Sequence, residues 1–343
     1  MSQLSERKRE ILRRLVEEYV ATGQPVASKG LAERSGLGVS SSTVRYELAE
    51  LESLGLLTHP HTSAGRVPTE TGYRLYADEL LDRLEPRPAR FPLDLTQMRN
   101  EVEGALQSTT EMLAQVTQLL ALVSAPPLET TSVRHVEVLV LQPDMIMVVV
   151  ITSTGGVTKR LFRFDAAVDP GLAEWARAYL NESLTGVRLG TALVRRQFED
   201  PGLAPRERAF LAALQPAFVE ALGETAPRLY VGGAAGLLGG VRADELDAYQ
   251  RLLEVLETRA AALQLLSETL DPRRPLVRVG PELDNPALRG AAFVGAGYGL
   301  ANRSLGAVGL LGPLRMDYDK AIRTVRAAAH ELSRLVEAIY EEP

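Results

Sequence analysis

The chain of 343 residues contains no cysteine, which excludes disulfides and thiolate metal sites and is typical of proteins in a reducing cytoplasm. Long hydrophobic runs are also missing, because the most nearly continuous one, Met145 to Ile151, is far too short to cross a bilayer. The first ten residues lack the apolar stretch of a secretion signal. We therefore expect a soluble cytoplasmic protein with no membrane partner.

Residues that carry covalent or metal chemistry are scarce. Two glycine-rich stretches, residues 232–236 and 295–299, lack the spacing or the following Gly-Lys-Ser/Thr of a phosphate-binding loop, so turns at strand edges explain them better. A metal site is disfavoured because only two of the four histidines lie close together, without a third ligand nearby. We expect no enzyme, no cofactor and no metal. The histidines are His59, His61, His135 and His330.

The net charge of −6 is unusual for a nucleic-acid-binding protein, which usually carries a basic surface. The charge must therefore be considered locally. Residues 1–90 contain equal numbers of basic and acidic side chains. No acid occurs between Ser53 and Thr69, where His59, His61 and Arg66 lie, so this segment repels phosphates less than the rest of the chain. We expect one such domain to bind DNA weakly.

Three short helical patterns open the chain. The first runs from Ser5 to Thr22 and ends at Gly23, the second runs from Ser28 to Arg34, and the third begins near Ser40 or Ser41. Three helices with a tight second turn are typical of the helix-turn-helix, whose third helix reads DNA. The spacing of apolar residues in the third helix predicts a core face of Val44, Leu48, Leu51 and Leu54.

The opposite face of this third helix carries Ser42, Thr43, Arg45, Tyr46 and Ala49. A guanidinium at this position can contact guanine or grip a phosphate, and the sequence alone does not choose between them. Two simpler interpretations remain open. The hydroxyl residues from 40 to 43 can merely cap the helix, and Arg45 can be an ordinary solvated side chain.

A polar hairpin follows the third helix. The stretch between Gly55 and Tyr76 begins with a short strand that leads into a polar Gly/Pro-rich segment, and this combination predicts the wing of a winged helix. Arg66 stands between Gly65 and Val67, and we expect it at the tip of this hairpin, where no core packs against it. A minor-groove or phosphate contact is the favoured role for it.

The remaining chain alternates helical and strand-like patterns. Helices are predicted over 71–84, 95–123, 170–222 and 318–340, and Pro126 prevents the second from continuing. A stiff proline-rich linker separates the first two of these helices. Apolar runs at 135–141, 145–152 and 157–164 predict an antiparallel meander. Strands return at 276–279, 291–296 and 305–311. We expect one sheet, begun before residue 165 and resumed after 275, in an α+β domain with a helical insertion.

A second apolar seam lies near residue 250. It is a candidate dimer interface, although an amphipathic helix packed on its own domain produces the same pattern. The seam residues that we assign to dimerisation are Leu246, Tyr249, Leu253, Leu256 and Leu263.

Several strings together resemble one known family. They are residues 23–29, the Ser-Ser-Thr-Val-Arg before Tyr46, Pro-His-Thr-Ser-Ala-Gly-Arg-Val-Pro-Thr over 60–69, Gly-Tyr-Arg-Leu-Tyr over 72–76, and the runs 229–233 and 306–318. The chain is thereby similar to HrcA, the heat-inducible transcription repressors of bacteria. Two positions depart from the family pattern, Tyr46 in place of Asn and Ala27 in place of Gly. The first puts an Asn–adenine contact in doubt and leaves Tyr46 as a phosphate or thymine-methyl partner.

The resemblance implies a fold and a function. The fold is multidomain α+β, with an N-terminal winged helix-turn-helix and a GAF-like α+β domain that carries an inserted, mainly helical dimerisation domain. The implied function is a homodimeric repressor that binds an inverted repeat of double-stranded DNA upstream of chaperone operons. Repression is relieved by heat and modulated by a chaperonin partner.

The domain boundaries that we predict are 1–85 for the winged helix, 86–94 for the linker, 95–165 and 241–343 for the GAF-like domain, and 166–240 for the insertion. The DNA-binding residues come from the recognition helix and from strings that match the family. They are Lys29, Ser40, Ser41, Ser42, Thr43, Arg45, Tyr46, His59, His61, Thr62, Ser63 and Arg66.

Two other functions stay open. A metabolite-responsive winged-helix regulator would hold a small ligand in a pocket between the sheet and its helices. The strands, however, are unusually apolar, as at Val148, Val149 and Val150, which favours a filled core. A scaffold that uses the winged helix to bind proteins would show no salt-dependent DNA binding.

Overall fold

The computed structural model describes residues 4–34, 38–60, 65–95, 98, 102–126, 132–153, 157–189, 192–223, 228–234, 259–267, 269, 274–300 and 303–340. The chain divides into two compact units. Unit 1 contains Met1–Leu93, Thr109–Val123 and Tyr230–Glu331, and unit 2 contains Asp94–Ser108, Ser124–Leu229 and Leu332–Pro343. Within the described ranges, no helix has the length and apolar character needed to traverse a lipid bilayer.

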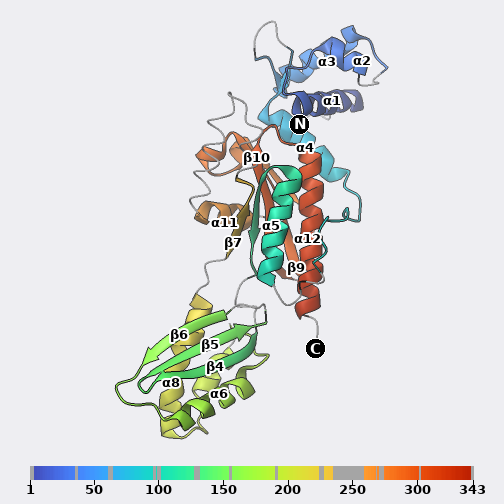
Figure 1. Cartoon of the computed structure of the whole chain (residues 1–343). Helices are drawn as coiled ribbons and strands as arrows, with labels where there is room; N and C mark the ends of the chain where they lie inside the picture. Colours follow the sequence, from blue (N-terminus) through green and yellow to red (C-terminus); the bar gives the residue numbers. More distant parts are fainter. Residues whose placement is uncertain are drawn as a thin grey trace. The chain divides into compact units, whose positions relative to one another are not determined.

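The three predicted N-terminal helices are confirmed in unit 1 (Figure 1). Helix α1 (Glu6–Thr22) begins after Ser5, whose hydroxyl accepts a hydrogen bond from the Lys8 amide at 3.4 Å, and ends at Gly23 with φ 64°. Glycine adopts this left-handed conformation without steric cost. Helix α2 spans Ser28–Arg34, and helix α3 spans Ser41–Ser53.

The core of the winged helix contains Val44, Leu48 and Leu51 of α3, as their spacing predicts. Leu54 does not join them, because it is 49% exposed. This correction has a local cause. Leu54 is the C-cap of α3, where the backbone leaves the helical conformation and no longer keeps the side chain on the buried stripe.

The wing is anchored by a small antiparallel sheet. Strand β1 (Leu57–Thr58) pairs with β2 (Val67–Pro68), and Val26 forms an isolated antiparallel bridge with Arg66 on the other side. Arg66 therefore lies at the base of the wing, and its predicted position at the tip is wrong. The two backbone hydrogen bonds between Val26 and Arg66, each 2.9 Å, hold it there.

Helix α4 (Glu70–Asp82) joins the winged helix to the rest of unit 1. The ring of Tyr73 stacks on Tyr318 with centroids 5.7 Å apart, and Tyr76 meets the same ring edge-on at 6.2 Å. Arg74 donates a hydrogen bond to the Val277 carbonyl. The winged helix and the sheet therefore share buried contacts inside one compact unit.

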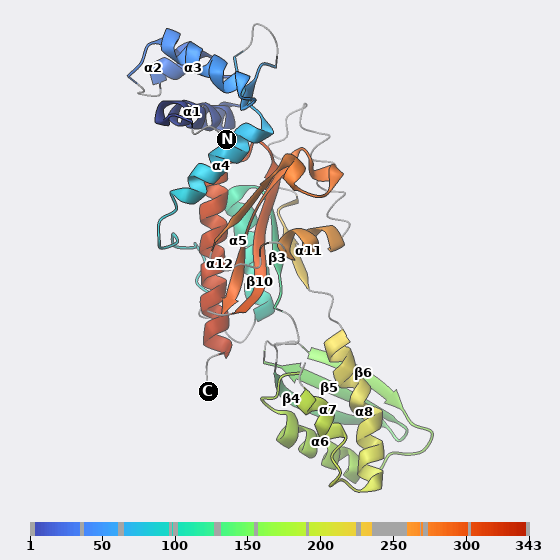
Figure 2. The same cartoon turned by 180° about the vertical axis from the view of Figure 1, so that it is seen from behind.

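The larger sheet has five strands in the order β7-β3-β10-β9-β8. Helices α5 (Val102–Thr117) and α12 (Tyr318–Tyr340) lie side by side over one face, and α11 (Arg259–Ser267) lies on the other (Figures 1 and 2). Short 3-10 turns at Gly280–Glu282 and Pro286–Leu288 precede β9. The strands are β3 (Leu120–Ser124), β7 (Leu229–Gly232), β8 (Leu276–Val279), β9 (Ala291–Leu300) and β10 (Arg303–Pro313).

The helix predicted over 95–123 is wrong at its C-terminal end. It stops at Thr117, Gln118 takes a positive φ of 58°, and the next residues form β3. All five residues of β3 are buried, since the strand lies between β7 and β10. A strand buried on both faces lacks the polar alternation that distinguishes it from a helix in sequence.

Unit 2 contains the predicted meander, which is confirmed as β4 (Val133–Gln142), β5 (Met145–Thr152) and β6 (Val157–Arg163). Helices α6 (Pro170–Leu184), α7 (Ala192–Phe198) and α8 (Pro205–Gly223) cover one face of it (Figure 2). One hydrophobic cluster joins the inner side chains of the strands to those of the three helices. The Ala125 amide donates to the Arg228 carbonyl at 2.8 Å where this part of the chain starts and ends.

The predicted single sheet is therefore wrong. The meander does not pair with the strands that follow residue 275, but forms a separate three-stranded sheet. Its buried face packs on helices of the insertion, so residues 133–163 group with the insertion and not with the first segment of the α+β domain.

The candidate dimer seam is described only in part. Leu246, Tyr249, Leu253 and Leu256 lie outside the described residues. Leu263 belongs to α11, which packs on β10 within unit 1, and its side chain is half-buried. This packing favours the alternative in which Leu263 lies on a helix that packs on its own domain.

Gly72 provides a test of how closely the wing packs on α4. A Cβ at Gly72 would lie 2.2 Å from the Leu56 carbonyl oxygen, which is backbone and cannot move aside cheaply. We expect Gly72→Ala to lower the free energy of unfolding by about 1–3 kcal/mol through overpacking. Chemical denaturation measures this loss, and exposed Thr71→Ala is the control that should change little. A Gly72→Ala protein as stable as the control would contradict the packing described here.

Candidate nucleic-acid interface

The start of α3 presents a cluster of hydroxyl groups. The Ser40 Oγ accepts a hydrogen bond from the Thr43 amide at 3.2 Å and lies 2.7 Å from Ser42 Oγ. Ser40 therefore caps α3, as one of the two interpretations of this segment states. Ser41 and Ser42 are exposed beside it, so the same turn offers small polar side chains to a ligand.

The outward face of α3 carries Arg45 and Tyr46, which the predicted helix spacing placed there. Both are exposed, Tyr46 by 63%, while Val44 and Leu48 on the other face are buried. The Tyr46 hydroxyl donates to Glu50 Oε1 at 2.7 Å. Arg45 makes no ion pair with any residue that the structure describes.

The three carboxylates of α3 are each paired with a cation from another element. Glu47 Oε1 lies 3.9 Å from Arg7 Nη1 of α1, and Glu50 pairs with Lys8, which is also on α1. The hydrogen bond from Lys8 lowers the pKa of Glu50 below its ordinary value. These pairs offset the negative charge of α3, so Arg45 is its uncompensated cation and the face suits a polyanion.

Glu52 links the wing to α3. Its Oε2 accepts from Arg66 Nε at 3.2 Å and lies 3.3 Å from His59 Nε2. The side chain of Arg66 is 14% exposed as a result. Glu52 is not among the predicted residues, although it stands directly before the acid-free segment that holds both Arg66 and His59.

The other predicted residues are placed less completely. Lys29 is exposed on α2, which packs against α3, and forms no ion pair among the described residues. His61, Thr62 and Ser63 lie outside the described part of the chain. No group of three metal-ligating side chains occurs in the described ranges. His135, far along the chain, pairs with Glu137 at 2.7 Å.

Comparison with known families decides what this geometry belongs to. Residues 3–80 match the family described as "Winged helix-turn-helix transcription repressor, HrcA DNA-binding". Residues 103–322 match the family described as "HrcA protein C terminal domain". The chain belongs to the HrcA family. HrcA proteins are transcription repressors and not enzymes, and the resemblance in the sequence is confirmed.

Relatives of this HrcA chain match it along almost its whole length. The heat-inducible transcription repressor HrcA of Parafrankia sp. (strain EAN1pec) is 38% identical over 98% of this chain and 99% of its own. The protein of the same name from Nocardia farcinica (strain IFM 10152) is 37% identical over 98% of both. A solved crystal structure, described only as a hypothetical protein, superimposes with a TM-score of 0.65 at 25% identity and covers 98% of each chain.

These comparisons confirm the fold class and the presence of a DNA-binding winged helix in HrcA. They do not reach single residues. The twelve predicted DNA contacts therefore stay predictions, which two sets of substitutions can test.

Arg45→Ala tests the recognition helix. We expect the loss of about 1–3 kcal/mol of operator affinity and relaxed specificity if Arg45 contacts a guanine. Titration of operator and of scrambled DNA, followed by fluorescence anisotropy, separates the loss of affinity from the loss of specificity. Arg195→Ala removes the same charge from an exposed position in unit 2 and should bind normally. An equal loss on both DNAs would mean a phosphate contact, and no loss would remove Arg45 from the interface.

Arg66→Ala tests the wing. Because the guanidinium is held by Glu52 and is mostly buried, we expect weaker binding to every DNA with an unchanged dependence on salt. Glu52→Gln should weaken binding in the same way, and the double variant should lose little more than either single one, since both remove one link. A salt slope that falls by about one unit in Arg66→Ala would instead indicate a direct phosphate contact.

Proposed function

We propose that this chain represses transcription as a homodimer bound to an inverted-repeat operator of double-stranded DNA upstream of chaperone operons. The observation that carries the proposal is the outward face of α3, where Arg45 has no carboxylate partner among the described residues, in a winged helix of the HrcA family. Two α3 helices would enter successive major grooves with the wings beside them. A repressor bound there in the cytoplasm would block access to the promoter.

A dimer is needed because one domain is a weak binder. The first ninety residues carry no net positive charge, so a single winged helix gains little from the phosphates. Linking two such domains raises their effective concentration on adjacent half-sites. The operator symmetry then reflects the symmetry of the protein.

Among the described residues, no helix covers one face of the unit 2 sheet, and this face supports a dimer. Helices cover the other face (Figure 2). The side chains of Met147, Val149 and Ile151 alternate along β5 with the buried ones of the hydrophobic cluster, so they point away from it. Neighbouring strands extend this apolar surface with Leu161 and Val157, which are 59% and 58% exposed. Contiguous exposed apolar area of this kind is typical of an interface.

The charges on this face favour a second copy of the chain as its occupant. Glu137 of β4 and Lys159 of β6 are both paired in register with Val149, so they flank it in one row. A twofold axis along β5 would place Glu137 opposite Lys159 of the partner subunit, and the reverse, across two sheets about 10 Å apart. The face is therefore complementary to itself.

Heat release and chaperonin modulation belong to the same proposal. Dissociation of the dimer on warming would expose the apolar sheet face and separate the two winged helices. Exposed apolar surface is what chaperones hold, so a chaperonin could act on the separated form. The relatives named heat-inducible repressors support this direction of the response.

A metabolite-responsive regulator with a ligand inside the α+β domain is less well supported. The glycines of the two central strands face filled space, since a Cβ at Gly309 would lie 2.4 Å from the Phe293 ring. Nine of the ten residues of β9 are buried. A sheet packed in this way offers little room for a ligand between it and its helices.

The decisive experiment is a mobility-shift assay of the full chain on an inverted-repeat fragment of a chaperone promoter. We expect a dimer-sized complex that is lost on a scrambled fragment and on warming. Recovery of the complex with added chaperonin would support the modulation. No binding at low ionic strength would contradict the proposed function as a whole.

A charge exchange tests the dimer geometry. We expect Glu137→Lys and Lys159→Glu each to raise the dimer dissociation constant roughly tenfold or more, because like charges then oppose each other. The double exchange should restore dimerisation. Sedimentation equilibrium measures the three constants, and Arg195→Glu on the covering helices is the matched control. Failure of the double exchange to restore the dimer would contradict the twofold axis along β5.

A further inference from the structure

A cavity of about 520 Å³ lies in unit 1, away from α3 and from the sheet interior. It is bounded by α1, α4, the proline-rich segment after α4 and the start of α12. This volume lies in the range of sites that hold small molecules. Nothing in the DNA-binding role requires it.

Tyr76 gives the first sign that the cavity binds a ligand. Its side chain is 6% exposed and lines the cavity, yet its hydroxyl makes no hydrogen bond with any described residue. Burial raises the pKa of Tyr76 well above its ordinary value, and the charges of Glu17 and Asp317 add to the effect. The phenol is thus a protonated donor at neutral pH.

Arg83, Arg87 and Arg326 line the cavity near the C-terminal end of α4, which we call its arginine end. Arg83 and Arg87 are exposed and make no ion pair within the described part of the chain. Arg326 donates to the carbonyls of Glu85 and Pro86, the second at 2.8 Å, and forms no ion pair with a described carboxylate. Guanidinium groups bind phosphate by paired, charge-assisted hydrogen bonds.

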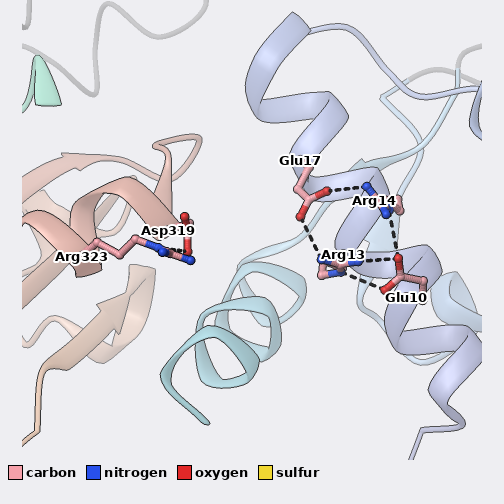
Figure 3. A network of polar contacts seen from close by, with 6 residues as sticks. All are labelled: Glu10, Arg13, Arg14, Glu17, Asp319 and Arg323. Atoms are coloured by element: carbon pink, nitrogen blue, oxygen red, sulfur yellow. Dashed lines mark hydrogen bonds and ion pairs between the residues drawn. The ribbon is translucent and has the colours of Figure 1, made fainter. Parts of the chain in front are cut away.

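Arg13 and Arg323 of the lining are already paired with carboxylates of their own helices, and Glu85 and Asp317 also line the cavity. Arg13 contacts Glu10 and Glu17 on α1, and Arg323 contacts Asp319 at 2.9 Å on α12 (Figure 3). These carboxylates keep unused lone pairs that can accept hydrogen bonds from hydroxyl groups. The Tyr76 end of the cavity is therefore suited to neutral donors and not to a second anion.

The two ends are about 10 Å apart. Tyr76 and Arg83 are seven residues apart on or at the end of α4, and a helix rises 1.5 Å per residue. Helix α12 runs in the same direction, because Tyr318 contacts Tyr76 and Arg326 contacts Glu85. A ligand that uses both ends must carry an anion at one end and hydroxyl groups at the other.

We propose that this cavity is a binding site for a small phosphorylated polyol, a sugar phosphate or a mononucleotide. The phosphate contacts Arg83 and Arg87, and the hydroxyl groups contact Tyr76 and the carboxylates of Glu17 and Asp319. Such a ligand touches α1 and α4 of the winged helix together with α12 of the sheet domain. It stabilises their packing, and any difference in its affinity between DNA-bound and unbound protein would change operator affinity.

Isothermal titration of the full chain without DNA tests the site directly. The probes are ribose 5-phosphate and AMP. Inorganic phosphate, which has only the anionic group, and ribose, which has only the hydroxyl groups, are the comparison ligands. We expect ribose 5-phosphate or AMP to bind at least tenfold more tightly than either comparison ligand. Equal binding of inorganic phosphate would overturn the polyol, and no binding by any probe would overturn the site.

Substitutions locate the binding. We expect the double variant Arg83→Ala/Arg87→Ala to bind the phosphorylated probe at least tenfold more weakly. Tyr76→Phe should bind it several-fold more weakly. Arg90→Ala is the matched control, an exposed arginine of the same segment outside the cavity lining. Circular dichroism and thermal melting confirm that each variant is folded. Unchanged binding in the double arginine variant would overturn the site, whatever the outcome of the operator assays.

Discussion

The contact of α4 with the start of α12 is the interaction on which unit 1 depends. Tyr73 and Tyr76 pack on the single ring of Tyr318, and Arg74 adds a hydrogen bond to β8. Because the wing in turn packs on α4 through Gly72, the DNA-reading elements share one buried core with the sheet. Motion of the winged helix as a separate domain would have to break these contacts, so its orientation is coupled to the state of the sheet domain.

Electrostatic pairing explains how an acidic chain presents a surface to DNA. A net charge of −6 suggests repulsion, yet each carboxylate of α3 lies against a cation from α1 or the wing. Pairs at such short range cancel most of each other's field beyond a Debye length. What remains at the exposed surface of α3 is Arg45. Arrangement and not net charge therefore decides the sign of the local potential.

Much of the fold follows from local signals in the sequence. The predictions that are wrong or missing all depend on tertiary structure, which no local signal carries. Ser5, Gly23 and Ser40 announce their helix ends through capping chemistry that needs no tertiary information. The boundaries of β5 and α12 also agree with those predicted from the sequence. The sequence does not distinguish strand β3 from a helix, because burial on both faces removes its alternation. It does not predict that the meander forms a separate sheet, because strand pairing depends on residues far apart in the chain. The role of Glu52 likewise needs the wing folded back onto α3, which no spacing along the chain reveals.

The way in which the chain enters and leaves the meander and its helices has a consequence for how the protein was assembled. The chain departs at the end of β3 and returns at β7, two strands that are neighbours in the sheet, and Ala125 and Arg228 are joined by a backbone hydrogen bond. Ends held this close let a segment of about one hundred residues be inserted at little cost in loop-closure entropy. A hairpin turn between the two strands would close the same gap, so an ancestral domain could have gained the meander and its helices in a single event without rebuilding its core.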